Sequence, residues 1–181
     1  MPETQPVFFE IKCECRIREL STGFGDVMRI AIASDHAGKE LKSHIIDFLT
    51  LTDHVVLDYG VATDSVGSVD YPDYADIVAS EVSNLRVDRG ILICGTGIGM
   101  CIAANKFPGV RATLVYDEFT ARMSRLHNDA NVCCMGARTI NHHRALDLIK
   151  LWLATEFEEG RHRTRLAKID QLEKRIQGQH S

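Results

Sequence analysis

The chain has 181 residues, of which 45% are hydrophobic, and a formal net charge of −4 at neutral pH. This length suits a single domain with a sizeable core, and the acidic balance argues against a nucleic-acid surface. No apolar run approaches the ~18 residues that span a bilayer, so we expect no membrane partner. The six cysteines show neither a C-x-x-C pair nor a disulfide framework, which is typical of thiols in a reducing cytoplasm.

Residues 1–27 differ in character from the remainder. Between Ile11 and Ile17 apolar and charged residues alternate, as in a strand that has no obvious partner. The segment has five acids, three bases and no apolar h-region, so neither a signal peptide nor a transit peptide fits. We expect a poorly ordered extension, or alternatively an appended strand, before a single domain over 28–181. Met28 is itself a candidate translation start.

From Arg29 onward, strand patterns alternate with helix patterns. Short apolar runs predict strands at 29–34, 54–59, 91–94, 110–115 and 131–136. Apolar residues at helical spacing predict a helix after each strand, with Asp35 and Asp73 as caps of the first two. A last amphipathic helix carries the apolar positions between Leu166 and Ile176. The loop at 60–72 is long enough to suggest a functional lid.

Five strand–helix units with short connections predict an α/β fold, a parallel sheet with helices on both faces. We expect a three-layer, doubly wound domain with flavodoxin-like strand order and a C-terminal amphipathic helix. Ligands of such folds bind beyond the carboxyl ends of the strands, at the switch point between the first and third strands. Those strands end in Asp35-His36 and in Cys94-Gly95-Thr96, so both clusters should meet at one crevice.

Three glycines, Gly95, Gly97 and Gly99, follow the third strand and lead into a helical pattern. A strand that passes through a glycine turn into a helix leaves backbone N–H groups unpaired, and such groups hold phosphates and oxyanions. Cys94, at the last position of the strand, would be favoured as a thiolate there. Taken alone, a tight turn beside a buried cysteine explains the pattern about equally well.

The motifs of the chain together resemble those of the ribose-5-phosphate isomerase B family over roughly 28–176. In order they are Ser34-Asp35-His36-Ala37-Gly38, Asp70-Tyr71-Pro72, Cys94-Gly95-Thr96-Gly97-Ile98-Gly99, Asn105-Lys106-Phe107, His127-Asn128-Asp129, Gly136-Ala137-Arg138 and Gly160-Arg161-His162. The resemblance implies that Cys94 accepts the proton and that His127 opens the sugar ring. The substrate-binding residues implied are Asp35, His36, Tyr71, Asn128 and the backbone of Gly95, Gly97, Ile98 and Gly99, with Arg138, Arg161 and Arg165 on the phosphate.

The residue types suit aldose–ketose isomerisation independently of the resemblance. The reaction needs a base, a hole for the developing oxyanion and a group that opens the hemiacetal. Cys94 can be the base, the glycine turn the oxyanion hole, and Thr96 a relay between the two substrate oxygens. Arg161 and Arg165 are four residues apart on one helical face and can hold a phosphate. The chemistry requires no metal and no cofactor.

Other interpretations of the same residues remain open at this point. Arg161 and Arg165 are also typical of a solvated helix face, and His127 of a helix C-terminal cap. A nucleotide-binding domain would use Gly95-x-Gly97, yet Met100 stands where its third glycine belongs. A non-catalytic sugar-phosphate sensor is a third class. Within the family, allose 6-phosphate, galactose 6-phosphate and four-carbon phosphates are alternatives to ribose 5-phosphate.

The location of His127 predicts the assembly. The helix after the fourth strand runs back toward the amino edge of the sheet, and His127 ends it. Cys94 lies at the carboxyl edge, too far away for one side chain to reach. We therefore expect a homodimer, alone or as a dimer of dimers, in which His127 of one subunit serves Cys94 of the other.

Overall fold

The computed structural model describes residues 27–62 and 64–179. The expectation for the N-terminal extension lies outside the described residues, apart from Val27. Within the described ranges, no helix has the length and apolar character needed to cross a membrane.

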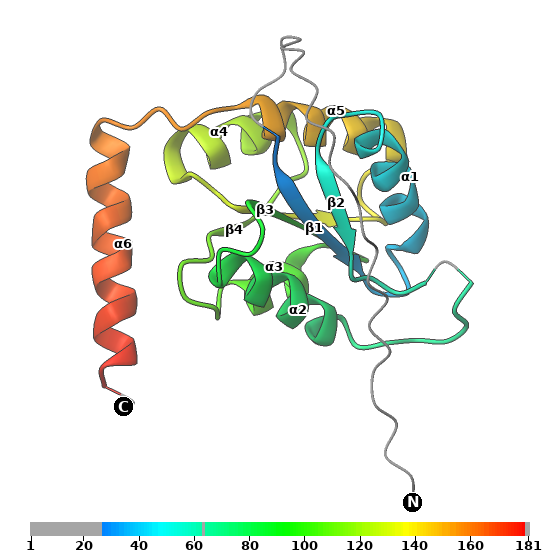
Figure 1. Cartoon of the computed structure of the whole chain (residues 1–181), viewed down its shortest axis with the longest axis horizontal. Coiled ribbons are helices and arrows are strands. Elements are labelled where there is room, and N and C mark those ends of the chain that lie inside the picture. Colours follow the sequence, from blue (N-terminus) through cyan, green and yellow to red (C-terminus); the bar gives the residue numbers. More distant parts are fainter. Residues whose placement is uncertain (1–26, 63, 180–181) are drawn as a thin grey trace, which may run out of the picture.

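Strands and helices alternate along the described chain as predicted (Figure 1). The strands are β1 (Arg29–Ser34), β2 (Val55–Asp58), β3 (Arg89–Cys94), β4 (Ala112–Leu114) and β5 (Val132–Gly136). The helices are α1 (Lys39–Leu49), α2 (Tyr71–Ser83), α3 (Ile98–Ala104), α4 (Glu118–Asn128), α5 (His142–Ala154) and α6 (Arg161–Gln177). Among the strands, the extent of β4 differs most from the prediction, because it has three residues instead of six.

The strands form one parallel sheet in the order β2-β1-β3-β5-β4. The predicted switch between β1 and β3 is confirmed, because these strands pair directly, with Ser34 opposite Ile93. The flavodoxin-like order is wrong in its outer half, since it would place β4 beside β3. The completely buried β5 takes that inner position, and the short, partly exposed β4 forms the edge. As a result, Gly136 lies opposite Cys94.

Side chains of the central strands alternate between two apolar layers. Ile30, Ile32 and the residues in phase with them pack against α1, α4 and α5. Ala31 and Ala33 lie in the other layer, against α2 and α3. Figure 1 shows these two helical layers on opposite faces of the sheet. The adjacent Cys133 and Cys134 belong to different layers, as the period of a strand requires.

The start of α2 differs from the prediction. The helix begins at Tyr71, with Asp70 at the N-cap position, rather than after Asp73. Pro72 lies in the first turn, where its fixed φ suits a helix and its missing N–H costs nothing. This early start places Tyr71 beside the glycine turn.

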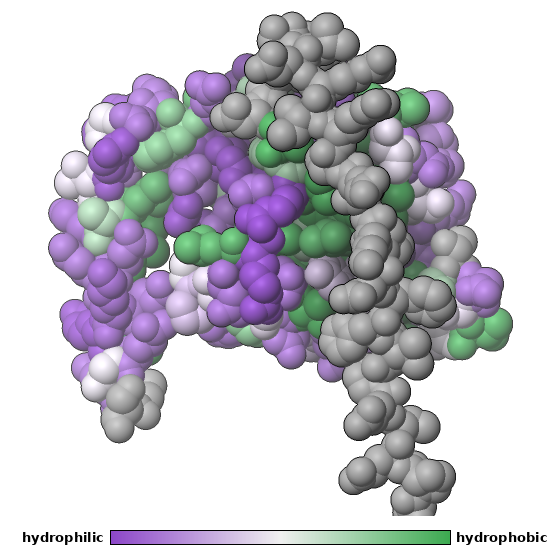
Figure 2. All heavy atoms as spheres, in the orientation of Figure 1, coloured by the Kyte–Doolittle hydropathy of each residue, from purple (hydrophilic) through white to green (hydrophobic). Residues whose placement is uncertain are grey.

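The last helix, α6, stands apart from the layered body and is joined to it by an extended segment after α5 (Figure 1). On the face shown in Figure 2, hydrophilic residues predominate over α6. Its apolar residues Ile169, Leu172 and Ile176 are each about half exposed, whereas Leu166 is buried. The helix thus presents an apolar stripe that the described part of this chain does not cover.

Candidate active site

Asp35 and His36 follow β1 at the carboxyl edge of the sheet. The buried Asp35 carboxylate accepts the N–H groups of Ala37 at 2.9 Å and Gly38 at 3.2 Å, which orders the turn into α1. His36 accepts the Val69 N–H at Nδ1, 3.2 Å away, and this bond ties the predicted lid to the site. Because Nδ1 is an acceptor, the neutral ring carries its proton on Nε2, which can donate to a sugar oxygen.

Cys94 ends β3 and is only 5% exposed. Its sulfur accepts the Gly97 N–H at 3.1 Å, so the thiol is held at the start of the glycine turn. Gly97 has a φ of +77°, and a Cβ there would lie 2.6 Å from the Leu114 side chain and 2.8 Å from the Met135 backbone. Only glycine fits this conformation and this space, so the turn from β3 into α3 depends on it.

Thr96, Ile98 and Gly99 complete the turn. The side chains of Thr96 and Ile98 are exposed, and the Thr96 hydroxyl accepts the Ile98 N–H at 3.4 Å. The Tyr71 ring packs directly on Gly99, where an added Cβ would come within 2.6 Å of it. Tyr71 therefore forms one wall of the turn, and Thr96 is open to a ligand.

Arg138 reaches the same edge because β5 is next to β3. The Ala137 N–H donates to the Cys94 carbonyl at 2.8 Å, and the Arg138 N–H donates to the Gly95 carbonyl at 3.0 Å. The Arg138 guanidinium lies 3.4 Å from the place that a Cβ of Gly95 would occupy. The carboxyl edge thus combines a thiol, backbone N–H groups and a guanidinium, which suits an anionic, oxygen-rich ligand.

His127 belongs to a second cluster, at the end of α4. Its ring stacks on that of His162, with centroids 4.1 Å apart and planes within 5°. Its Nε2 is 3.8 Å from the Glu158 carboxylate. Burial, together with the charge of His127, lowers the pKa of His162.

This second cluster is also the place where the described residues could hold a metal ion. One ligand atom each from His127, Glu158 and His162 lie within 4.8 Å of one another. However, Arg161 Nε donates to His162 Nε2 at 3.3 Å, and its positive charge competes with a cation there.

The predicted phosphate ligands Arg161 and Arg165 lie in the first turns of α6, and both are exposed. Asn128 is the last residue of α4 and is also exposed. Asp129, at a φ of +42°, binds the guanidinium of Arg111 at 2.8 Å and that of Arg125 at 2.7 Å. These bonds fix the helix end that presents Asn128 beside His127.

The two clusters lie at opposite edges of the sheet within one chain. Arg111, directly before β4, binds the carbonyls of Asn128 and Asp129, so α4 ends at the amino edge. From Val132 to Gly136, β5 rises about 13 Å at ~3.3 Å per residue. Gly136 pairs with Cys94 at the carboxyl edge, so this rise separates Cys94 from the amino edge, where α4 ends. A histidine side chain is too short to span that distance.

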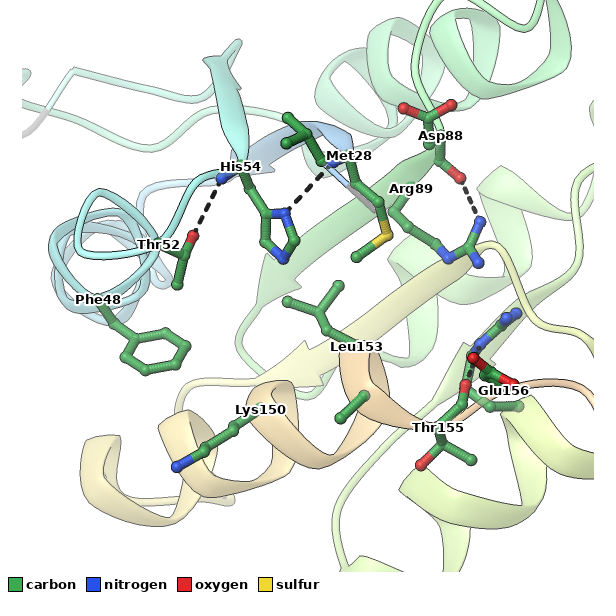
Figure 3. Close-up of a pocket in the computed structure, with 13 residues that line it drawn as sticks. Met28, Phe48, Thr52, His54, Asp88, Arg89, Lys150, Leu153, Thr155 and Glu156 are labelled. Carbon is green, nitrogen blue, oxygen red and sulfur yellow. Dashed lines mark hydrogen bonds between the residues drawn. The ribbon is translucent and has the colours of Figure 1, made fainter. Parts of the chain in front are cut away.

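A cavity of about 590 Å³ lies away from both clusters. It lies at the amino edge, between β1, β3 and the ends of α1 and α5, and Figure 3 shows Met28, His54, Arg89 and Leu153 around it. Burial, then the nearby charge of Arg125, lowers the pKa of Arg89. The residues that line this cavity include neither Cys94 nor any residue of the glycine turn, so the cavity is separate from both.

Sequence reasoning gave no role to His162 or Glu158. His162 belongs to the Gly160-Arg161-His162 motif, but nothing in the spacing indicates that it stacks on a ring 35 positions earlier. It also missed the double ion pair of Asp129. The signal that could have pointed to Asp129 is its type, because aspartate tolerates the left-handed conformation at a helix end.

Comparisons with known proteins agree with one another. A family model described as Ribose/Galactose Isomerase matches residues 30–169. YwlF of Bacillus subtilis, whose name places it among sugar phosphate isomerases without specifying the sugar, is 49% identical over 148 residues, 82% of this chain and 99% of that protein. Ribose-5-phosphate isomerase B of Escherichia coli is 43% identical over 147 residues, 81% of this chain and 97% of that protein.

Solved structures give the same result. Ribose-5-phosphate isomerase B from Clostridium thermocellum is 48% identical with a TM-score of 0.78, over 82% of this chain and 99% of that one. Its counterpart from Mycoplasma genitalium, solved with bound ribulose-5-phosphate, is 43% identical with a TM-score of 0.77, over 81% and 96%.

Proposed function

The chain belongs to the ribose/galactose isomerase family and is an aldose–ketose isomerase of sugar phosphates, and we propose that it interconverts ribose 5-phosphate and ribulose 5-phosphate with Cys94 as the base. The observation that carries the proposal is the Cys94 sulfur, 3.1 Å from an N–H of the glycine turn at the switch point of the sheet. The ribulose-5-phosphate bound to the Mycoplasma genitalium relative supports a pentose phosphate as the substrate.

In the proposed reaction, Cys94 removes the proton from C2 of the open-chain aldose. The electron pair forms the enediolate, and the C1 oxygen becomes an oxyanion facing the N–H groups of the glycine turn. One such donor typically contributes ~3 kcal/mol to the transition state. Thr96 moves a proton from O2 to O1, and Cys94 returns its proton to C1, which yields the ketose. His127 protonates the ring oxygen in the preceding ring opening.

The phosphate would be bound by guanidinium groups. Arg161 and Arg165 are exposed on one face of α6, beside His127 and not beside the Cys94 of the same chain. Arg138 lies over Gly95, where it can meet the substrate from the side of the glycine turn. In the proposed site the sugar lies between these groups, with its reacting carbons at Cys94.

Such a site requires a second copy of the chain. Half of the exposed large apolar residues of the described chain lie on α3, at the start of α4 and along α6, namely Ile98, Ile102, Tyr116, Phe119, Ile169, Leu172 and Ile176. A two-fold dimer can cover part of these residues and bring His127 of one subunit to Cys94 of the other, forming two equal sites. Pairing of such dimers into a tetramer is compatible with the same sites.

Turnover assays test the proposal. We expect the purified protein to convert ribose 5-phosphate faster than allose 6-phosphate, galactose 6-phosphate or erythrose 4-phosphate. Cys94→Ala should lower kcat by roughly 10²–10⁴ with little change in substrate binding, as for a lost general base. Cys133→Ala is a matched control, since that thiol is buried in the opposite layer. A Cys94→Ala variant within a few-fold of the parent would show that another group is the base.

A further inference from the structure

The cavity of about 590 Å³ at the amino edge takes no part in the proposed isomerisation, because its lining includes neither Cys94 nor His127. Its volume falls within the range of ~300–1,000 Å³ that is typical of small-molecule sites. Around it lie the half-buried apolar side chains of Met28, Phe48 and Leu153 (Figure 3). The cavity therefore offers room and apolar surface for the body of a small organic ligand.

Two side chains of the lining, His54 and Arg89, present N–H donors (Figure 3). His54 Nδ1 accepts the Met28 N–H at 3.3 Å, so the neutral ring carries its proton on Nε2. One nitrogen of the Arg89 guanidinium donates to the Asp88 carbonyl at 2.7 Å. The His54 Nε2–H and the other N–H groups of the guanidinium have no acceptor among the described residues. Half-buried donors without acceptors favour a ligand that supplies oxygen atoms.

Arg89 also has no ion pair with a carboxylate of the described residues. The carboxylate of the adjacent Asp88 accepts the Arg29 N–H at 2.7 Å and lies 3.6 Å from the Arg29 guanidinium. In Figure 3 this carboxylate points away from the Arg89 guanidinium, which contacts the Asp88 carbonyl instead. The positive charge of Arg89 is thus left beside the cavity without a direct counter-charge.

A second guanidinium group, that of Arg125, adds to this positive charge. It lines the cavity, and Arg125 is only 4% exposed. Its ion-pair partner Asp129, 2.7 Å away, also binds Arg111 at 2.8 Å, so one carboxylate serves two guanidinium groups. Arg125 Nε donates to the Thr155 carbonyl at 3.2 Å and so occupies a carbonyl at the end of α5 that would otherwise attract a cation. The charge around the cavity therefore favours an anion.

The remaining charged side chains of the lining, Lys150 and Glu156, are exposed and opposite in sign, so their charges offset each other. We propose that the cavity is a second ligand site, which binds a small organic anion. A carboxylate or phosphate group of the ligand accepts hydrogen bonds from Arg89 and His54, because a guanidinium can pair either group through two parallel bonds. The apolar part of the ligand packs against Phe48.

Matched probes test the site by isothermal titration calorimetry of the full-length protein. Phenylpropionate carries a carboxylate on an apolar body, phenyl phosphate carries a phosphate, and phenylpropanol is the neutral counterpart of the first probe. We expect at least one anion to bind with a Kd of ~1 mM or below, as is common for ligands of this size. The alcohol should bind at least ~10-fold more weakly, because it lacks the charged hydrogen bonds. No binding of either anion up to ~10 mM, or equal binding of the alcohol, would overturn the proposal.

Variants locate the bound anion. Arg89→Met should weaken its binding by about 10- to 100-fold, and Arg89→Lys by less, because lysine keeps the charge but not the planar group. His54→Phe should also weaken it, and this variant repeats the test if Arg89→Met melts early. Arg161→Ala is the matched control, since Arg161 is absent from the cavity lining and should leave binding unchanged. Binding that is lost in Arg161→Ala and unchanged in Arg89→Met would place the probe at the candidate active site and refute the proposal. Calorimetry measures no turnover, so the result is independent of the proposed function.

Discussion

Mixing two inactive variants tests whether each site is shared between subunits. His127 and Cys94 lie at opposite edges of a sheet in which β5 alone rises about 13 Å, so they cannot meet within one chain. In a mixed dimer of Cys94→Ala and His127→Ala subunits, one site carries both changes and the other carries neither. With random exchange, half of the dimers are mixed and each has one intact site. Recovery should therefore reach about one quarter of the parent activity.

The assay follows ribulose 5-phosphate formation after the two variants are dissociated together and reassociated. Subunit exchange is confirmed with a mass tag on one variant. The matched control mixes Cys94→Ala with the double variant Cys94→Ala/His127→Ala, in which every site lacks the thiol and no recovery is expected. Complete exchange without recovery would refute the shared site.

Three further predictions follow from the same geometry. Arg161→Ala and Arg165→Ala should raise KM for phosphorylated sugars much more than for phosphate-free ones, and equal effects on both would assign these side chains a structural role. Gly97→Ala should lower the free energy of unfolding by about 2–5 kcal/mol in urea titrations, because backbone strain of ~1–2 kcal/mol adds to a clash of ~1–3 kcal/mol. Gly109→Ala, with a φ of +69° and open space, should show the strain alone, and a similar loss in both variants would rule out the clash. Deletion of 1–27 should leave turnover unchanged and shift the Tm by less than about 2 °C, because the described sheet is complete without these residues. Aggregation of the shortened protein would instead support a packed strand within 11–17.

The hydrophobic pattern was sufficient to predict most of the fold. A strand buried on both faces must be a short continuous apolar run, and a helix covering a sheet must repeat its apolar positions every three or four residues. Both patterns are local, so the strand–helix alternation could be predicted from them, whereas the switch between β1 and β3 was expected from the general topology of doubly wound folds. The glycines of the turn were equally informative, because the φ of Gly97 and its contact with Met135 exclude any side chain.

The tertiary structure decided what depends on neighbours distant in sequence. Apolar runs do not indicate which strand lies beside which, and only packing placed the buried β5 next to β3, which brought Arg138 to Gly95. The stack of His127 on His162 arises in the same way. A side chain's type and spacing determine the face it occupies, whereas its partner across an interface is set by how whole elements pack.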